Sequence, residues 1–92
     1  MHWVLSYDVV DDRRRTRFFK RLKRFLIPVQ KSVFEGPLSV SALREVESLI
    51  ARELDLETDS VRLYPLPAGA VGLIRCWGVA APLADPDEPI LL

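Results

Sequence analysis

The sequence predicts an α+β fold in which a four-stranded antiparallel sheet carries two helices on one face. Four short segments rich in β-branched and aromatic residues are interleaved with two longer segments whose apolar residues recur every three or four positions. Gly and Pro residues separate several of these segments. The chain of 92 residues is long enough for one domain, residues 1–92. Within it we expect a core of about residues 1–80 and a tail of residues 81–92.

The first predicted strand and helix occupy the amino-terminal part of the chain. Residues 2–8 contain Trp, Val, Leu and Tyr without a breaker, which is typical of a strand. Asp11 or Asp12 can cap the free N–H groups that begin a helix, and either carboxylate is favoured at the positive end of the helix dipole. Apolar residues at positions 18, 19, 22, 25 and 26 then share one face, so the helix is predicted to run to about residue 25 or 26, before Pro28.

The remaining elements follow the same alternation. A second helix is expected over about residues 40–54, with Ser39 or Ser41 as its cap. Further strands are predicted over residues 29–35, 60–66 and 71–77, with a turn at residues 67–69. In literal order the elements are strand, helix, strand, helix, strand and strand. Four strands with two helices on one face form the ferredoxin-like layer arrangement.

The tail is rich in turn residues and ends in three apolar residues, Ile90, Leu91 and Leu92. These residues have no evident place in a four-stranded sheet. We therefore expect a short carboxy-terminal strand that pairs with the dimer partner, and a frayed end is the alternative. A homodimer also suits a chain this short, because a small domain alone buries a limited share of its surface.

Charge is segregated along the chain although the formal net charge is zero. Residues 1–31 hold nine Lys or Arg against three acidic residues, whereas residues 32–92 hold four against ten. This asymmetry indicates a polyanionic partner for the basic half, and a solvated basic helix is the alternative. No apolar run approaches the roughly 18 residues of a membrane span and no signal peptide precedes the first strand, so we expect no membrane role and a cytoplasmic location.

The first predicted helix carries its cations opposite its apolar face. At about 100° per residue, three cations fall within about 40° of Arg13, and the four form what we call the basic stripe: Arg13, Arg17, Lys20 and Arg24. Arg15 falls instead on the apolar side, over the sheet and near the end of the first strand. It is expected either to pair with Asp8 or a neighbouring acid, or to contact a phosphate.

Asp8 is the candidate metal ligand. It ends the first strand, where a carboxylate can be a ligand, a catalytic group or a cap for the following loop. Mg²⁺ prefers oxygen ligands, commonly one or two carboxylates together with water and phosphate. A symmetric dimer would bring two copies of Asp8 together around one ion.

Three segments carry a family resemblance: YDVVDDRRR at residues 7–15, VQKSVFEG at residues 29–36 and DSVRLYPL at residues 59–66. In this order they resemble the signature motifs of the CRISPR-associated protein 2 family. The resemblance covers nearly the whole chain, and the three motifs together are far more specific than each one alone.

The resemblance implies a homodimer that acts in CRISPR adaptation (spacer acquisition), binds protospacer duplex DNA and bridges dimers of the CRISPR-associated protein 1 integrase. It also implies an endonuclease for single-stranded RNA or duplex DNA that depends on Mg²⁺ or Mn²⁺, with Asp8 as metal ligand and catalytic residue. The expected nucleic-acid contacts are Arg13, Arg14, Arg15, Arg17, Lys20 and Arg24. The candidates for substrate or interface contacts are Tyr7, Ser32 and Phe34.

Three alternatives remain open at the level of sequence. The chain could be a non-catalytic architectural subunit that binds DNA, or an RNA-cleaving toxin similar to VapD. A ferredoxin-like domain that binds a small-molecule regulator is the third, and the basic stripe disfavours it because such a domain has no need of one.

Overall fold

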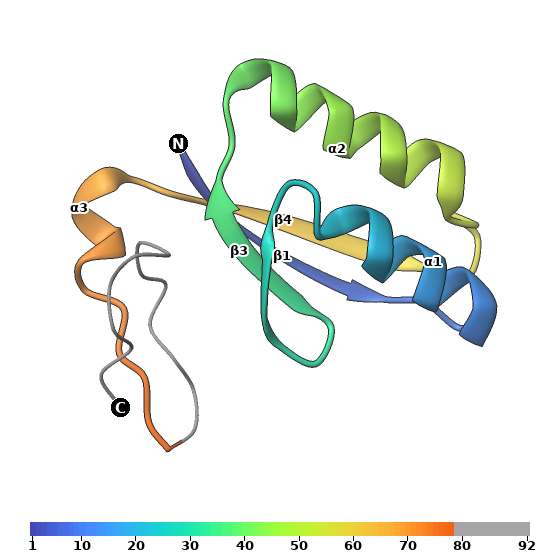
Figure 1. Ribbon diagram of the computed structural model, residues 1–92, viewed down its shortest axis with the longest axis horizontal. Helices are drawn as coiled ribbons and strands as arrows, with labels where there is room; N and C mark the ends of the chain where they lie inside the picture. The colour runs from blue at the N-terminus through green and yellow to red at the C-terminus, as the bar shows by residue number, and fades with distance from the viewer. Residues whose placement is uncertain (79–92) are drawn as a thin grey trace.

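The computed structural model describes residues 1–78 and confirms the α+β arrangement (Figure 1). Four strands form one sheet in the order β2-β3-β1-β4, and every neighbouring pair is antiparallel. The elements in chain order are β1 (His2–Asp8), α1 (Asp12–Leu22), β2 (Ile27–Gln30), β3 (Val33–Pro37), α2 (Val40–Glu53), β4 (Ser60–Leu66) and α3 (Ala68–Val71). Strands β1 and β4 lie side by side, with α1 and α2 over the sheet (Figure 1).

The core lies between the sheet and the two long helices. Leu5 of β1 and Phe34 of β3 are fully buried and contribute the sheet side of this core. Phe18 from α1 and Val46 from α2 are also fully buried and contribute the helix side. Burial of side chains of this size stabilises the fold by roughly 1.5–3 kcal/mol each, so packing fixes how α1 and α2 sit on the sheet.

Local capping explains where both long helices begin. Asp11 caps α1, and its carboxylate accepts a hydrogen bond from the Arg14 backbone N–H at 2.9 Å. Ser39 caps α2, and its hydroxyl accepts from the Ala42 backbone N–H at 3.1 Å. The predicted starts of both helices are therefore confirmed.

Three sequence-based boundaries are wrong. Helix α1 ends at Leu22 rather than at residue 25 or 26, because the next turn directs Leu26 into the core, where it is 2% exposed. The predicted strand over residues 29–35 is a hairpin of β2 and β3, which reverses at Ser32 with a φ of 64°. The predicted strand over residues 71–77 does not form, because residues 68–71 make the short helix α3 and residues 72–77 have no strand structure.

These corrections change the order of the elements but keep the fold class. With the hairpin in place, the order is strand, helix, strand, strand, helix, strand, which is the ferredoxin-like order. The expected carboxy-terminal strand of the tail lies outside the described residues. Within residues 1–78, no helix has the length and hydropathy needed to cross a bilayer.

Candidate active site and nucleic-acid interface

Asp8 is the last residue of β1 and its side chain is exposed. Its neighbour Tyr7 is buried against the helices, and because side chains alternate along a strand, Asp8 faces the opposite side of the sheet. On that face it lies across from Ser60 of β4, with Ser6 and Arg62 as the next pair along. Among the described residues, no hydrogen bond or ion pair reaches the Asp8 carboxylate. Asp11 provides the helix cap, so Asp8 remains available to a ligand.

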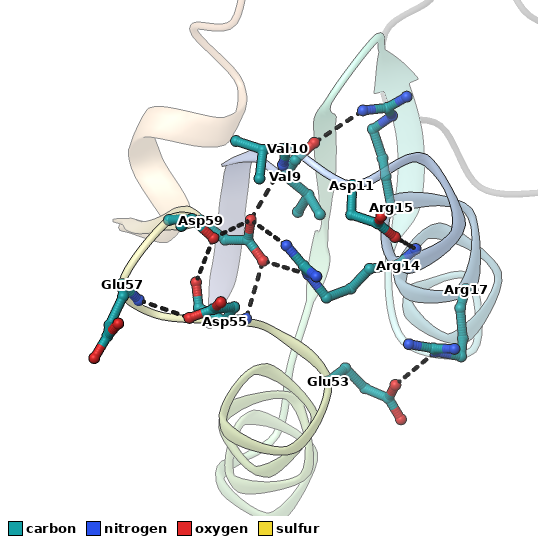
Figure 2. Close-up of polar contacts among 11 residues, drawn as sticks. Val9, Val10, Asp11, Arg14, Arg15, Arg17, Glu53, Asp55, Glu57 and Asp59 are labelled. Atoms are coloured by element: carbon teal, nitrogen blue, oxygen red, sulfur yellow. Dashed lines mark hydrogen bonds and ion pairs between the residues drawn. The ribbon is translucent and has the colours of Figure 1, made fainter.

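The loop that follows Asp8 is held by Asp59, which lies just before β4 (Figure 2). The Asp59 carboxylate accepts the Val10 backbone N–H at 3.1 Å and the Asp55 backbone N–H at 3.0 Å. Arg14 of α1 completes the group with two hydrogen bonds, from Nε to Oδ2 at 2.7 Å and from Nη2 to Oδ1 at 3.0 Å. We call these four residues the Asp59 cluster. It ties the loop after β1, the first turn of α1 and the loop before β4 to one carboxylate.

The surroundings of Asp59 strongly stabilise its ionised form. The hydrogen bond from Arg14 holds the pKa of Asp59 well below its usual range, and the backbone N–H groups of Asp55 and Val10 act in the same direction. Burial opposes them, since the Asp59 side chain is 0% exposed. No local sequence pattern predicts this role, because the two partners Arg14 and Asp59 are 45 residues apart.

Arg15 points back over the loop after β1. Its Nη1 donates to the Val9 backbone oxygen at 2.8 Å (Figure 2). Its Nη2 pairs with Asp12. The expected pairing with a neighbouring acid is therefore present, and that acid is Asp12 rather than Asp8. Arg15 thus fixes the backbone one residue after Asp8.

The basic stripe follows the exposed side of α1 and the turn after it. Arg13, Lys20 and Arg24 are exposed, and the described part of the chain offers none of them an ion-pair partner. Arg17 pairs with Glu53 of α2, from Nε to Oε2 at 3.0 Å. The stripe therefore keeps three unpaired cations and one shared cation, all accessible to a polyanion.

The structure engages or buries three of the expected contact residues, Arg14, Tyr7 and Phe34. Arg14 was expected to contact nucleic acid, but its guanidinium is occupied by Asp59. Phe34 is 0% exposed and Tyr7 is 7% exposed, so neither ring offers a face on which a base could stack. Their rings belong to the core, with centroids 6.1 Å apart, and burial raises the pKa of Tyr7. Ser32 lies at the reversal of the β2–β3 hairpin, where its backbone oxygen accepts the Tyr7 backbone N–H at 3.1 Å.

The chemistry of Asp8 fits one ligand of a divalent cation. Its carboxylate is exposed and unengaged within the described residues, and Mg²⁺ is commonly held by one or two carboxylates plus water and substrate phosphate. No cluster of three or more Asp, Glu, His or Cys side chains able to hold a metal occurs in residues 1–78. An ion held at Asp8 would therefore need further oxygen ligands from water, from substrate phosphate or from a second copy of the chain.

Comparison with known proteins places the chain in a family of nucleic-acid enzymes. The family model "CRISPR associated protein Cas2" matches residues 1–72, so the chain belongs to the Cas2 family. It is 36% identical over 88 residues to the "CRISPR-associated endoribonuclease Cas2 3" of Chloroflexus aurantiacus, covering 96% of this chain and 95% of that one.

Solved structures agree on the fold. The crystal structure of hypothetical protein TT1823 from Thermus thermophilus superposes with a TM-score of 0.76 at 32% identity, covering 86% of this chain and 92% of that chain. A chain of the "Partial Cas6-RT-Cas1--Cas2 complex" superposes with a TM-score of 0.60 at 21% identity, covering 99% of this chain and 98% of that chain. The second likeness concerns the fold alone.

Proposed function

We propose that the protein is a divalent-metal-dependent endonuclease subunit of CRISPR adaptation, active as a homodimer. The observation that carries the proposal is the exposed, unpaired Asp8 at the end of β1, on a strand that leads directly into the helix carrying the basic stripe. The relative from Chloroflexus aurantiacus is named an endoribonuclease, which supports cleavage of RNA. Duplex DNA is the second substrate class, because the cations of the basic stripe can bind the phosphates of either nucleic acid.

Each residue of the site has a defined task in this proposal. A metal ion bound at Asp8 would activate water and stabilise the charge that develops on the scissile phosphate. Asp8 and its copy in the second subunit would hold that ion. Arg15 and the Asp59 cluster keep the loop after Asp8 in one conformation, which fixes the carboxylate relative to the substrate. Arg13 and Lys20 would bind the sugar–phosphate backbone alongside.

The same dimer would bind protospacer duplex DNA and bridge integrase dimers of the CRISPR-associated protein 1 type. Membership of the Cas2 family supports this partnership. In that setting the Asp8 site could be dispensable. The purely architectural function is favoured by one observation: Arg13, Lys20 and Arg24 are exposed without ion-pair partners within residues 1–78, and binding through them does not require Asp8.

Cleavage assays distinguish the two functions. Wild-type protein, Asp8→Asn and the control Glu47→Gln would be incubated with single-stranded RNA and with duplex DNA, in Mg²⁺, in Mn²⁺ and in EDTA. Glu47 is an exposed carboxylate of α2, so its replacement removes the same charge away from the site. We expect cleavage by wild type and Glu47→Gln in either metal, and a loss of at least about 100-fold in Asp8→Asn and in EDTA. Equal cleavage by Asp8→Asn would refute the proposed mechanism, and loss of cleavage with retained spacer acquisition would identify the architectural function.

A further inference from the structure

A second concentration of positive charge lies outside the site described above. An open groove of about 580 Å³ runs between the carboxy-terminal end of α1 and the face of α2. Phe25 and Leu49 are among its apolar lining residues. Its polar lining consists of Arg21, Arg24, Arg44, Glu45, Ser48 and Arg52. Four guanidinium groups thus share this groove with a single lining carboxylate.

Little of this charge is neutralised within the described residues. Arg24 and Arg44 have no ion-pair partner there. Arg52 approaches the Glu53 carboxylate only at 3.6 Å, and Glu53 also pairs with Arg17 and Arg21. One carboxylate therefore serves three arginines, and the groove keeps an excess of positive charge.

The spacing of these residues on α2 is that of one exposed helix face. Arg44, Ser48 and Arg52 are four residues apart in succession, so they form a row along the helix. The core-facing residues of α2, such as Val46, are buried on the other side. Arg44 and Arg52 lie about two turns apart with Ser48 between them, so both guanidinium groups can face one elongated ligand.

The groove continues the basic stripe. Arg21 lines this groove and also a shallower hollow on α1 that Arg13, Arg17 and Lys20 border. Arg24, the last member of the stripe, lines the groove itself. Helix α1 has 11 residues, or about 16 Å at 1.5 Å per residue, which corresponds to about five base pairs of duplex at 3.4 Å each. A phosphate backbone that follows the stripe would therefore reach the groove within half a turn of duplex.

We propose that this groove is a second phosphate-binding site, in which Arg44 and Arg52 of α2 hold the backbone of the nucleic acid that lies along the basic stripe. The inference rests on the proposed nucleic-acid function and extends its binding surface from α1 onto α2. Guanidinium groups match phosphate oxygens with paired hydrogen bonds, which explains the use of arginine at all four positions. The succession of cations from Arg13 on α1 to Arg52 on α2 favours a polyanion over an acidic peptide, which would need only the groove.

The salt dependence of duplex binding tests this assignment. Affinity for a 30-base-pair duplex would be measured in EDTA, which prevents metal-dependent cleavage, over a series of salt concentrations. The variants are Arg44→Gln and the double variant R44Q/R52Q, and the control is Arg75→Gln, which removes an exposed cation beside residues of β2 and β3. Thermal unfolding of each variant would show that the fold is intact, since exposed substitutions change stability little.

We expect the salt slope to become shallower by about 0.9 for Arg44→Gln and by about 1.8 for the double variant, with about eightfold weaker binding per lost contact at 0.1 M salt. The Arg75→Gln slope should equal that of wild type. Variant slopes equal to the control, with wild-type binding intact, would overturn the groove assignment alone. If the slopes stayed equal while R44Q/R52Q lost binding to a Glu-rich peptide, the groove would be assigned to an acidic protein partner instead of a nucleic acid. A wild-type protein that binds neither duplex DNA nor single-stranded RNA would overturn the proposed function together with the groove.

Discussion

Replacement of Asp59 by Asn exchanges one carboxylate oxygen for an NH₂ group and removes the charge on which three segments of the chain depend. In the native protein, Oδ2 accepts from Arg14 Nε at 2.7 Å and from the Asp55 backbone N–H at 3.0 Å. The other oxygen, Oδ1, accepts from Val10 and from Arg14 Nη2. An Asn side chain keeps one acceptor oxygen, and its NH₂ group would face N–H donors in place of the other. Two of the four N–H donors therefore lose their acceptor in either orientation.

The size of the effect follows from those two bonds. A hydrogen bond to a charged group contributes about 1.5–3 kcal/mol, and water can recover part of the loss at the Arg14 side. We expect Asp59→Asn to lower the free energy of unfolding by about 2–4 kcal/mol. For a domain of this size, this corresponds to a fall in Tm of roughly 10–25 °C. Thermal unfolding followed by circular dichroism would measure it.

The matched control is Glu57→Gln, on the same loop as Asp59. Glu57 is exposed, and the contact recorded for it is a hydrogen bond from its backbone N–H to Asp55 at 3.1 Å, which the substitution keeps. Its Tm should remain within about 3 °C of wild type. If Asp59→Asn unfolded at the same temperature as Glu57→Gln, the claim that the Asp59 cluster holds the loop after Asp8 would be refuted.

Three further predictions follow from the packing and charge of the fold. The pKa of Asp59 is lowered in the folded state, so the ionised carboxylate stabilises the fold at every pH above the unfolded pKa. This stabilisation is lost as the pH falls below about 4 toward the lower folded pKa. Acid unfolding monitored by fluorescence should therefore be less steep in Asp59→Asn than in wild type. Phe34→Leu should lower the free energy of unfolding by about 1–2 kcal/mol in denaturant titrations, yet leave nucleic-acid affinity unchanged, because this ring is fully buried; a selective loss of affinity would contradict its place in the core. Gly36→Ala should destabilise the protein by about 1 kcal/mol, since a Cβ there would lie 3.2 Å from Leu26 Cδ2, and a Tm equal to that of wild type would show that Leu26 moves aside freely.

Local signals predicted the parts of the fold that depend on neighbouring residues. Asp11 and Ser39 cap the two long helices as their sequence positions suggest, and β1 and β4 have the predicted bounds. The β2–β3 hairpin was missed because Ser32 adopts a left-handed φ of 64° without the Gly or Asn that usually marks such a turn. Residues 71–77 carry apolar residues that suit a strand, but β2 already supplies the fourth strand of the sheet.

The candidate site was predictable only where it depends on residues close together in the sequence. The position of Asp8 at the end of a strand and the stripe on α1 both follow from short-range periodicity. The pairing of Arg14 with Asp59 depends on how α1 packs beside the loop before β4, which no local pattern encodes. From the sequence, Arg14 is therefore indistinguishable from the other cations of α1, although in the fold its guanidinium binds the Asp59 carboxylate.

The central claim is that one catalytic metal ion is shared by the Asp8 carboxylates of two subunits. Subunit mixing tests it most directly: wild-type and Asp8→Asn chains are combined in varying ratios under conditions of exchange, and the RNA cleavage rate in Mg²⁺ is measured at constant total protein. If both carboxylates are needed, activity follows the fraction of wild-type pairs and falls to about a quarter at an equal mixture, because random pairing squares the wild-type fraction. A fall to about one half would show that each Asp8 acts alone. Activity that does not change as Asp8→Asn replaces wild type would contradict the account.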